Sequence, residues 1–92
     1  MSLVTRISIN YRGRVQGVGF RWNVKQIVDN FPCSGYVKNL KDGSVDVLLE
    51  GKRSDLKNCI IQIEQRLGGK WVNKTEDERP GKPLFEEFAI LY

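Results

Sequence analysis

The sequence predicts an α+β fold in which two helices cover one face of an antiparallel sheet. Stretches with a period of two and stretches with a helical period follow each other as strand, helix, strand, strand, helix, strand, with one more strand at the end. This order is the split βαβ arrangement. A chain of 92 residues can bury one core but not two, so we expect a single domain over residues 1–92.

The first strand and the first helix follow from a change of period. Over residues 6–12 polar and apolar side chains alternate, which is typical of a half-buried strand that ends before Gly13. A helix is then predicted from residue 20 to residue 31, because its apolar residues gather on one helical face and Pro32 ends it. That face consists of Phe20, Val24, Ile27, Val28 and Phe31.

The next two strands form a hairpin. One is predicted around Val37 and the other over residues 45–49, where Val45, Val47 and Leu49 alternate with other residues. They are joined by the segment LKDGS, in which Asp42-Gly43 is typical of a tight turn.

A second helix and two further strands complete the chain. We expect Ser54 to cap the helix and the glycines at 68–69 to end it. A fourth strand begins at residues 71–72, residues 73–83 are predicted to form a solvated loop, and apolar side chains alternate over residues 88–92 in a last strand. The apolar face of the helix consists of Leu56, Cys59, Ile60, Ile63 and Leu67.

Composition excludes several classes of protein. Hydrophobic residues make up 40% and charged residues 28%, values of an ordinary folded domain. No apolar run approaches the length of a membrane helix and no signal peptide is recognisable, so we expect no membrane contact and a cytoplasmic location. Cys33 and Cys59 lack CxxC spacing, which favours two reduced thiols over a single bridge and gives a zinc site little support.

The segment GRVQGVGFR, residues 13–21, has the properties of an anion-binding loop, and the net charge of +4 suits an anionic ligand. The loop leads into a helix N-terminus, whose first N–H groups lack partners and whose dipole is positive. Gly17 and Gly19 let a phosphate approach the backbone, and Arg21 can add a guanidinium that matches two phosphate oxygens. A tight turn with purely structural glycines is the alternative, but it leaves Arg21 unexplained.

Several known phosphate-binding motifs and catalytic groups are absent from the sequence. Trp22 stands at the third glycine of GxGxxG, and no Gly-Lys-Ser/Thr follows for a Walker loop. The chain has no histidine, neither cysteine has an arginine six residues later, and no pair of carboxylates supports a metal cluster. What remains is positioning and electrostatic catalysis of an already reactive phosphoryl bond, such as that of an acyl phosphate, with a neutral amide holding the attacking water.

Two segments resemble the acylphosphatase family, and together they are highly specific: GRVQGVGFR, and GYVKNLKDGSVDVLLEG at residues 35–51. The resemblance implies a ferredoxin-like α/β sandwich and a small free-standing acylphosphatase without metal or organic cofactor. It implies that Arg21 and Asn39 are the catalytic residues and that Asn39 positions the water. The implied phosphate loop consists of Gln16, Gly17, Val18, Gly19, Phe20 and Arg21. We further expect Gln16 to brace this loop.

Other readings remain open at this stage. Asn39 adjoins a turn, where asparagine often caps backbone groups. A non-catalytic phosphate- or RNA-binding module shares the same element order, although residues 44–50 offer no aromatic side chain for base stacking. An interaction-only domain, as at the start of larger carbamoyl-transfer proteins, is a third possibility. We expect a monomer whose partner is a small acyl phosphate and not a nucleic acid.

Overall fold

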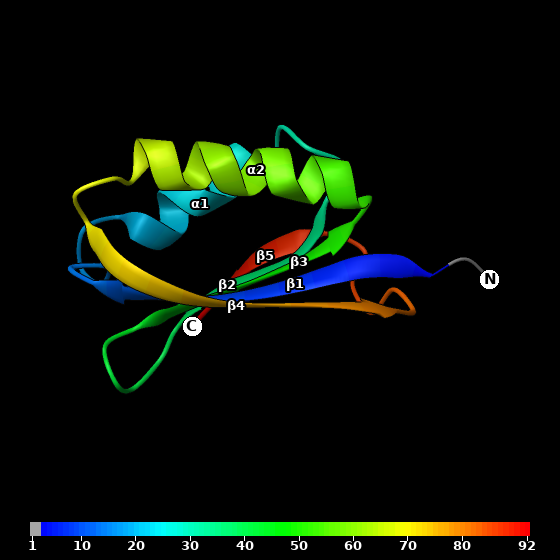
Figure 1. The fold of residues 1–92 in the computed structure, drawn as a ribbon. Helices are drawn as coiled ribbons and strands as arrows, with labels where there is room; N and C mark the ends of the chain where they lie inside the picture. Colours follow the sequence, from blue (N-terminus) through cyan, green and yellow to red (C-terminus); the bar gives the residue numbers. More distant parts are fainter. Residues whose placement is uncertain (1–2) are drawn as a thin grey trace.

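The computed structural model describes residues 3–92 and confirms the expected ferredoxin-like α+β fold. Five strands form one sheet in the order β4-β1-β3-β2-β5, and both helices lie on the same face of it (Figure 1). The elements are β1 (Val4–Gly13), α1 (Phe20–Val28), β2 (Ser34–Asn39), β3 (Val45–Gly51), α2 (Arg53–Arg66), β4 (Trp71–Gly81) and β5 (Phe88–Leu91).

The sheet is mixed because of its last strand. β1 pairs antiparallel with both β3 and β4, and β2 pairs antiparallel with β3. β5 instead runs parallel to β2, with Val37 opposite Ile90. Residues 82–87 carry the chain from β4 at one edge of the sheet to β5 at the other edge. This crossover returns the chain in the direction of β2, so the expected antiparallel sheet holds for four strands only.

The core lies between the sheet and the two helices, as the sequence periods predict. Ile7, Ile9 and Tyr11 of β1 point towards the helices and are at most 1% exposed. The buried residues of α1 and α2 that pack above them are Phe20, Val24, Ile27, Val28, Leu56, Cys59, Ile60 and Ile63. Burial of these apolar faces is the main term that stabilises the fold.

The solvated loop expected over residues 73–83 is wrong for most of its length, because β4 pairs with β1 all the way to Gly81. The charged side chains that suggested a loop belong to an edge strand, where charge is common. Alternate residues of β4 point towards α2 and form ion pairs with it. These pairs are Lys74–Glu64, Lys57–Glu76 and Arg53–Glu78.

Both helices differ slightly at their ends from the sequence prediction. α1 ends at Val28, because the following residues tighten into a turn in which the Phe31 N–H donates to the Val28 carbonyl at 2.9 Å. α2 has Lys52 at its N-cap, so Ser54 lies inside the first turn and the expected Ser54 cap is wrong. At the other end of α2, Gly69 has a φ of +87°, which confirms a glycine stop.

The crossover of residues 82–87 is fixed to the open face of the sheet by a buried carboxylate. Glu50 of β3 is 2% exposed, and it accepts hydrogen bonds from Arg6 Nε at 2.8 Å and Arg6 Nη2 at 2.6 Å. It also accepts from the backbone N–H groups of Leu84, at 2.9 Å, and Phe85, at 3.1 Å. Both carboxylate oxygens are therefore satisfied, and the crossover depends on them.

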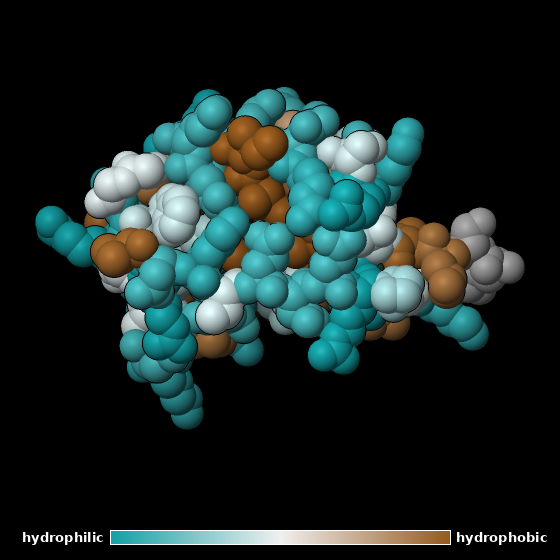
Figure 2. Space-filling model, viewed as in Figure 1, coloured by the Kyte–Doolittle hydropathy of each residue, from teal (hydrophilic) through white to brown (hydrophobic). Residues whose placement is uncertain are grey.

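The surface is mostly hydrophilic on the side shown in Figure 2, with a few separate apolar groups. Within residues 3–92, none of the helices has the length and apolar character needed to cross a membrane.

Candidate active site

A pocket of about 180 Å³ opens at the N-terminus of α1. Three separate parts of the chain meet there: the loop between β1 and α1, the end of β2, and the end of β5. The pocket therefore brings Arg21 and Asn39 together, as the resemblance implies. Its lining residues are Val15, Gly17, Gly19, Phe20, Arg21, Trp22, Asn39, Ile90 and Tyr92.

Two glycines give the loop its shape. Gly17 and Gly19 both have a φ of +75°, in the left-handed region that side chains disfavour. A Cβ at Gly17 would meet nothing within 4 Å, and a Cβ at Gly19 would meet only Asn23 Nδ2, at 3.7 Å. Backbone conformation, and not crowding by the protein, therefore requires glycine at these two positions.

The N–H groups of this loop have no acceptors within the protein. Across residues 3–92, none of the backbone N–H groups of residues 16–22 donates a hydrogen bond to another residue. The first bond of the helix start is that of Asn23 N–H to the Gly19 carbonyl, at 3.0 Å. Gly19 is the N-cap and provides no side-chain cap. An uncapped helix N-terminus of this kind is suited to binding an anion.

Arg21 lies in the first turn of α1 and is held by the end of β5. Its Nη1 donates to the Leu91 carbonyl at 3.1 Å, and its guanidinium carbon lies 4.8 Å from the centre of the Tyr92 ring. One turn further along the helix, Lys25 donates to the Phe88 carbonyl at 3.1 Å. In the part of the chain that the structure describes, no carboxylate forms an ion pair with Arg21. Its positive charge is therefore available to a ligand.

Asn39 is the last residue of β2 and carries an unsatisfied polar atom. Its side chain is on the same face of the strand as the buried Val37, the face towards the helices. The Oδ1 atom of Asn39 is buried and accepts no hydrogen bond from any residue of the range 3–92. The alternative in which this oxygen caps a backbone group of the turn is therefore not supported. A buried acceptor without a donor is costly unless a water or ligand supplies one.

Gln16 braces the loop, as expected from the sequence. Its Nε2 donates to the carbonyls of Leu40, at 2.8 Å, and Ser44, at 2.9 Å, on either side of the β2–β3 turn. These hydrogen bonds connect the loop between β1 and α1 to Leu40, the residue that follows Asn39. Gln16 does not line the pocket, and neither does Val18, which packs against the core.

The floor under the loop is apolar and neutral. Phe20 is 1% exposed, and its ring lies 5.7 Å from that of Tyr11. The Tyr11 hydroxyl donates to Glu64 Oε2 at 2.9 Å. Burial, reinforced by the charge of Glu64, raises the pKa of Tyr11 far above its usual range, so its hydroxyl stays protonated.

The cysteines and the acidic residues contribute little to the pocket. Cys33 and Cys59 are both free thiols, and neither lines it. Among the residues described, no three His, Cys, Asp or Glu side chains come together in a way that could hold a metal ion.

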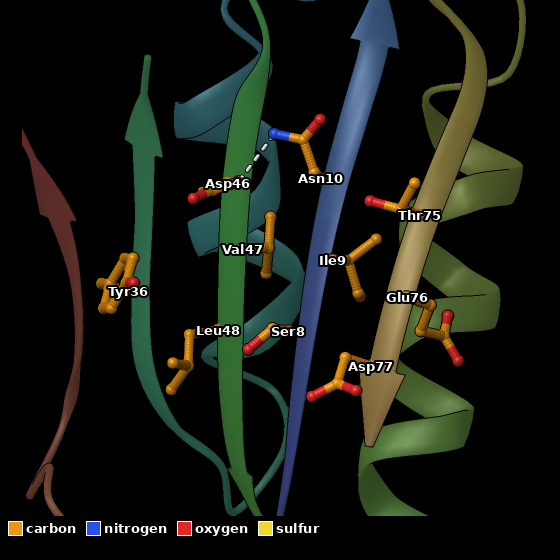
Figure 3. A pocket seen from close by; sticks show the side chains of 10 residues that line it. All are labelled: Ser8, Ile9, Asn10, Tyr36, Asp46, Val47, Leu48, Thr75, Glu76 and Asp77. Carbon is orange, nitrogen blue, oxygen red and sulfur yellow. Dashed lines mark hydrogen bonds between the residues drawn. The ribbon is translucent and has the colours of Figure 1, made fainter. Parts of the chain in front are cut away.

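A second pocket, of about 190 Å³, lies on the open face of the sheet (Figure 3). Asn10 projects from β1 beside it and donates from Nδ2 to Asp46 Oδ1 at 2.7 Å. Tyr36 is its single aromatic lining residue, and three of the others are acidic. The lining consists of Ser8, Ile9, Asn10, Tyr36, Asp46, Val47, Leu48, Thr75, Glu76 and Asp77.

The chain matches known proteins over almost its whole length. The family model described as acylphosphatase matches residues 7–90. The chain belongs to the acylphosphatase family. An acylphosphatase from Lacticaseibacillus paracasei is 45% identical over 81 residues, which make up 86% of this chain and 87% of that protein.

Solved structures of acylphosphatases have the same fold. The crystal structure of the Bacillus subtilis acylphosphatase matches with a TM-score of 0.88 and 31% identity, and the match covers 96% of this chain and 99% of that one. The structure of HypF from T. kodakarensis matches with a TM-score of 0.81 and 27% identity, but only 12% of that longer chain is covered. The acylphosphatase fold thus also occurs as a small part of larger proteins.

Sequence reasoning missed four residues of the pocket: Val15, Trp22, Ile90 and Tyr92. In the sequence Trp22 stands out only as a departure from GxGxxG, although its 60% exposed side chain lies beside Arg21 and lines the pocket. The alternation over residues 88–92 predicts a strand, but it does not show which strand of the sheet lies beside it. Only the parallel pairing of β5 with β2 shows that this strand ends beside Asn39.

Proposed function

We propose that this chain hydrolyses the carboxyl–phosphate bond of small acyl phosphates, giving a carboxylate and inorganic phosphate. The observation that carries the proposal is the uncapped start of α1, whose N–H groups over residues 16–22 lack acceptors, next to Arg21 and Asn39. Membership of the acylphosphatase family supports the reaction.

The phosphate group is bound by the loop. The amides of residues 16–21 and the guanidinium of Arg21 donate to the peripheral phosphate oxygens, where charge lies in the loose transition state of phosphoryl transfer. Donors that are already in place need no reorganisation during the reaction, so they stabilise the transition state more than water does. Because these groups supply the positive charge, we propose that no metal ion is required.

Asn39 holds the attacking water. Its unsatisfied Oδ1 accepts a hydrogen bond from that water, which is then placed in line with the bond to the acyl oxygen. The water oxygen forms a bond to phosphorus while the bond between phosphorus and the acyl oxygen breaks, and the carboxylate leaves with the electron pair. The chain has no histidine and no Asp or Glu lines the pocket, so the proton of the water passes to a phosphate oxygen.

The test is hydrolysis of acetyl phosphate in the presence of a chelator. We expect Arg21→Gln and Asn39→Ala each to lower kcat/KM by about 100-fold or more, because the first removes a donor that stabilises the transition state and the second removes the acceptor that positions the water. Arg14→Gln and Asn58→Ala are matched controls at exposed positions and should leave it unchanged. Full activity of either site variant would contradict the mechanism. An inactive wild-type protein would support a non-catalytic module instead.

The open face gives little support to the RNA-binding alternative. Its pocket is lined by Asp46 and Asp77 and by no Lys or Arg, and Tyr36 is its single aromatic residue. Binding of a polyanion needs basic groups and aromatic rings. We further propose that the protein is a cytoplasmic monomer that consists of one domain and binds no nucleic acid. Size-exclusion chromatography and a titration with single-stranded RNA test these points.

A further inference from the structure

We propose that Tyr92 is a positioning residue for Arg21: its ring, in cation–π contact with the guanidinium, holds Arg21 against the end of β5 with its remaining N–H groups ready for a phosphate. The proposal rests on the proposed function in one respect, the assignment of the phosphate group to this pocket. The stacking itself can be measured without a substrate.

The geometry singles out Arg21 as the partner of Tyr92. The guanidinium carbon lies 4.8 Å from the ring centre, within the range of a cation–π interaction. Tyr92 is 95% exposed, so its ring adds almost nothing to the core. We therefore assign the role of Tyr92 to its contact with Arg21. Both residues line the same pocket.

Arg21 needs such a contact because nothing else fixes both its plane and its direction. An arginine side chain has many rotamers, and ordering it when a ligand binds lowers the affinity. Among the described residues no carboxylate pairs with Arg21, and its one hydrogen bond uses Nη1, which donates to the Leu91 carbonyl. A single hydrogen bond still lets the guanidinium rotate about it, whereas a second contact with the Tyr92 ring restricts this rotation.

Stacking and phosphate binding use different parts of the guanidinium. The contact with Tyr92 places the guanidinium carbon over the ring, whereas hydrogen bonds to phosphate oxygens are made by the N–H groups along the edge of the guanidinium. A guanidinium has five N–H donors, and the Leu91 carbonyl takes one of them. The ring and the carbonyl can thus orient Arg21 without competing with the ligand.

Lys25 provides the matched control. It lies one helical turn from Arg21 and also joins α1 to β5, through the Phe88 carbonyl at 3.1 Å. Lys25 does not line the pocket. Lys25→Ala therefore loosens the docking of β5 on α1 without removing a contact of Arg21.

The first measurement is made on the free protein. In its NMR spectrum we expect the Arg21 side-chain N–H signal to carry a ring-current shift in the wild type and in Tyr92→Phe, and to lose it in Tyr92→Ala. Absence of this shift in the wild type would overturn the proposal whether or not the protein hydrolyses acyl phosphates.

The second measurement is the affinity for inorganic phosphate, with the KM for acetyl phosphate beside it. Tyr92→Ala should weaken both by about two- to fivefold, the size of an exposed cation–π contact. Tyr92→Phe and Lys25→Ala should change neither. In an Arg21→Gln background, Tyr92→Ala should have no further effect.

Three results would refute the proposal at this stage: unchanged phosphate affinity in Tyr92→Ala, an equal loss in Lys25→Ala, or the same loss in the Arg21→Gln background. A merely structural role of Tyr92 would instead lower the Tm of Tyr92→Ala and leave phosphate binding unchanged. Wild-type protein that binds phosphate through Arg21 but hydrolyses no acyl phosphate would contradict the proposed function and leave the role of Tyr92 supported.

Discussion

Replacing Glu50 by glutamine should strongly destabilise the fold. The Glu50 side chain is 1% exposed and pairs with Arg6, which is 22% exposed. A glutamine keeps one acceptor oxygen for Leu84 and Phe85, but its NH₂ group would face the N–H donors of Arg6. Breaking a buried ion pair costs about 3–5 kcal/mol, and we expect about 3 kcal/mol because Arg6 keeps part of its hydration. For a domain of this size, that lowers the Tm by about 12 °C or more.

The assay is urea unfolding followed by circular dichroism, with Glu78→Gln as the matched control. Glu78 accepts from Arg53 Nε at 2.6 Å, and Glu50 accepts from Arg6 Nη2 at the same 2.6 Å, but the Arg53 side chain is 61% exposed. Water screens the exposed pair, so Glu78→Gln should change the free energy of unfolding very little. Equal losses in the two variants would show that burial of the Glu50 carboxylate does not stabilise the crossover, and would refute this reasoning.

The same variant should change the pH dependence of stability. Burial opposes ionisation of Glu50, but hydrogen bonds from the Leu84 N–H, Arg6 and the Phe85 N–H outweigh it and lower the Glu50 pKa. A lowered pKa stabilises the fold above the unfolded-state value of about 4.3, and this contribution is lost as the pH falls through the folded-state pKa. The difference in free energy of unfolding between wild type and Glu50→Gln should therefore shrink below about pH 4.

Two further substitutions test packing and bracing. Gly35→Ala would place a Cβ 1.8 Å from the Leu48 carbonyl oxygen at a φ of +136°, so we expect a loss of about 4 kcal/mol in urea unfolding. Gly43→Ala, with nothing within 4 Å of its Cβ, should cost clearly less, and equal losses would rule out the clash. Gln16→Ala should lower kcat/KM for acetyl phosphate about tenfold, because the loop loses two hydrogen bonds to the β2–β3 turn. The control Gln62→Ala, at an exposed position, should leave kcat/KM unchanged. An unchanged kcat/KM in Gln16→Ala would show that these two hydrogen bonds are not needed for activity.

The parts of the fold that the sequence predicts well have local patterns. The helical faces, the alternation of β1 and the Asp42-Gly43 turn each depend on neighbours within a few positions. β4 has no such pattern, because its charged residues are stabilised by Lys57 and Arg53 of α2, many positions earlier in the chain. Its identity as a strand therefore depends on tertiary contacts that no local rule contains.

The same distinction applies to the site. The glycine loop is local, and its helix N-terminus could be predicted from residues 13–21 alone. The meeting of Arg21 with Asn39 was implied only by the family resemblance, because periodicity does not specify the order of strands in a sheet. The contacts of Tyr92 could not be predicted either, since they require β5 to lie parallel to β2.

The strand order also determines when the site can form during folding. β1 leads into the phosphate loop and pairs with β4, which lies about sixty positions further along the chain. β2 ends at Asn39 and pairs with β5, the last strand of the chain. Such distant pairings are slow, because the intervening chain must be ordered first. The phosphate loop, Asn39 and the contacts of Arg21 with Leu91 and Tyr92 therefore come together only after residues 88–92 have left the ribosome. A chain stopped shortly before β5 would carry the whole glycine loop and still lack an assembled site.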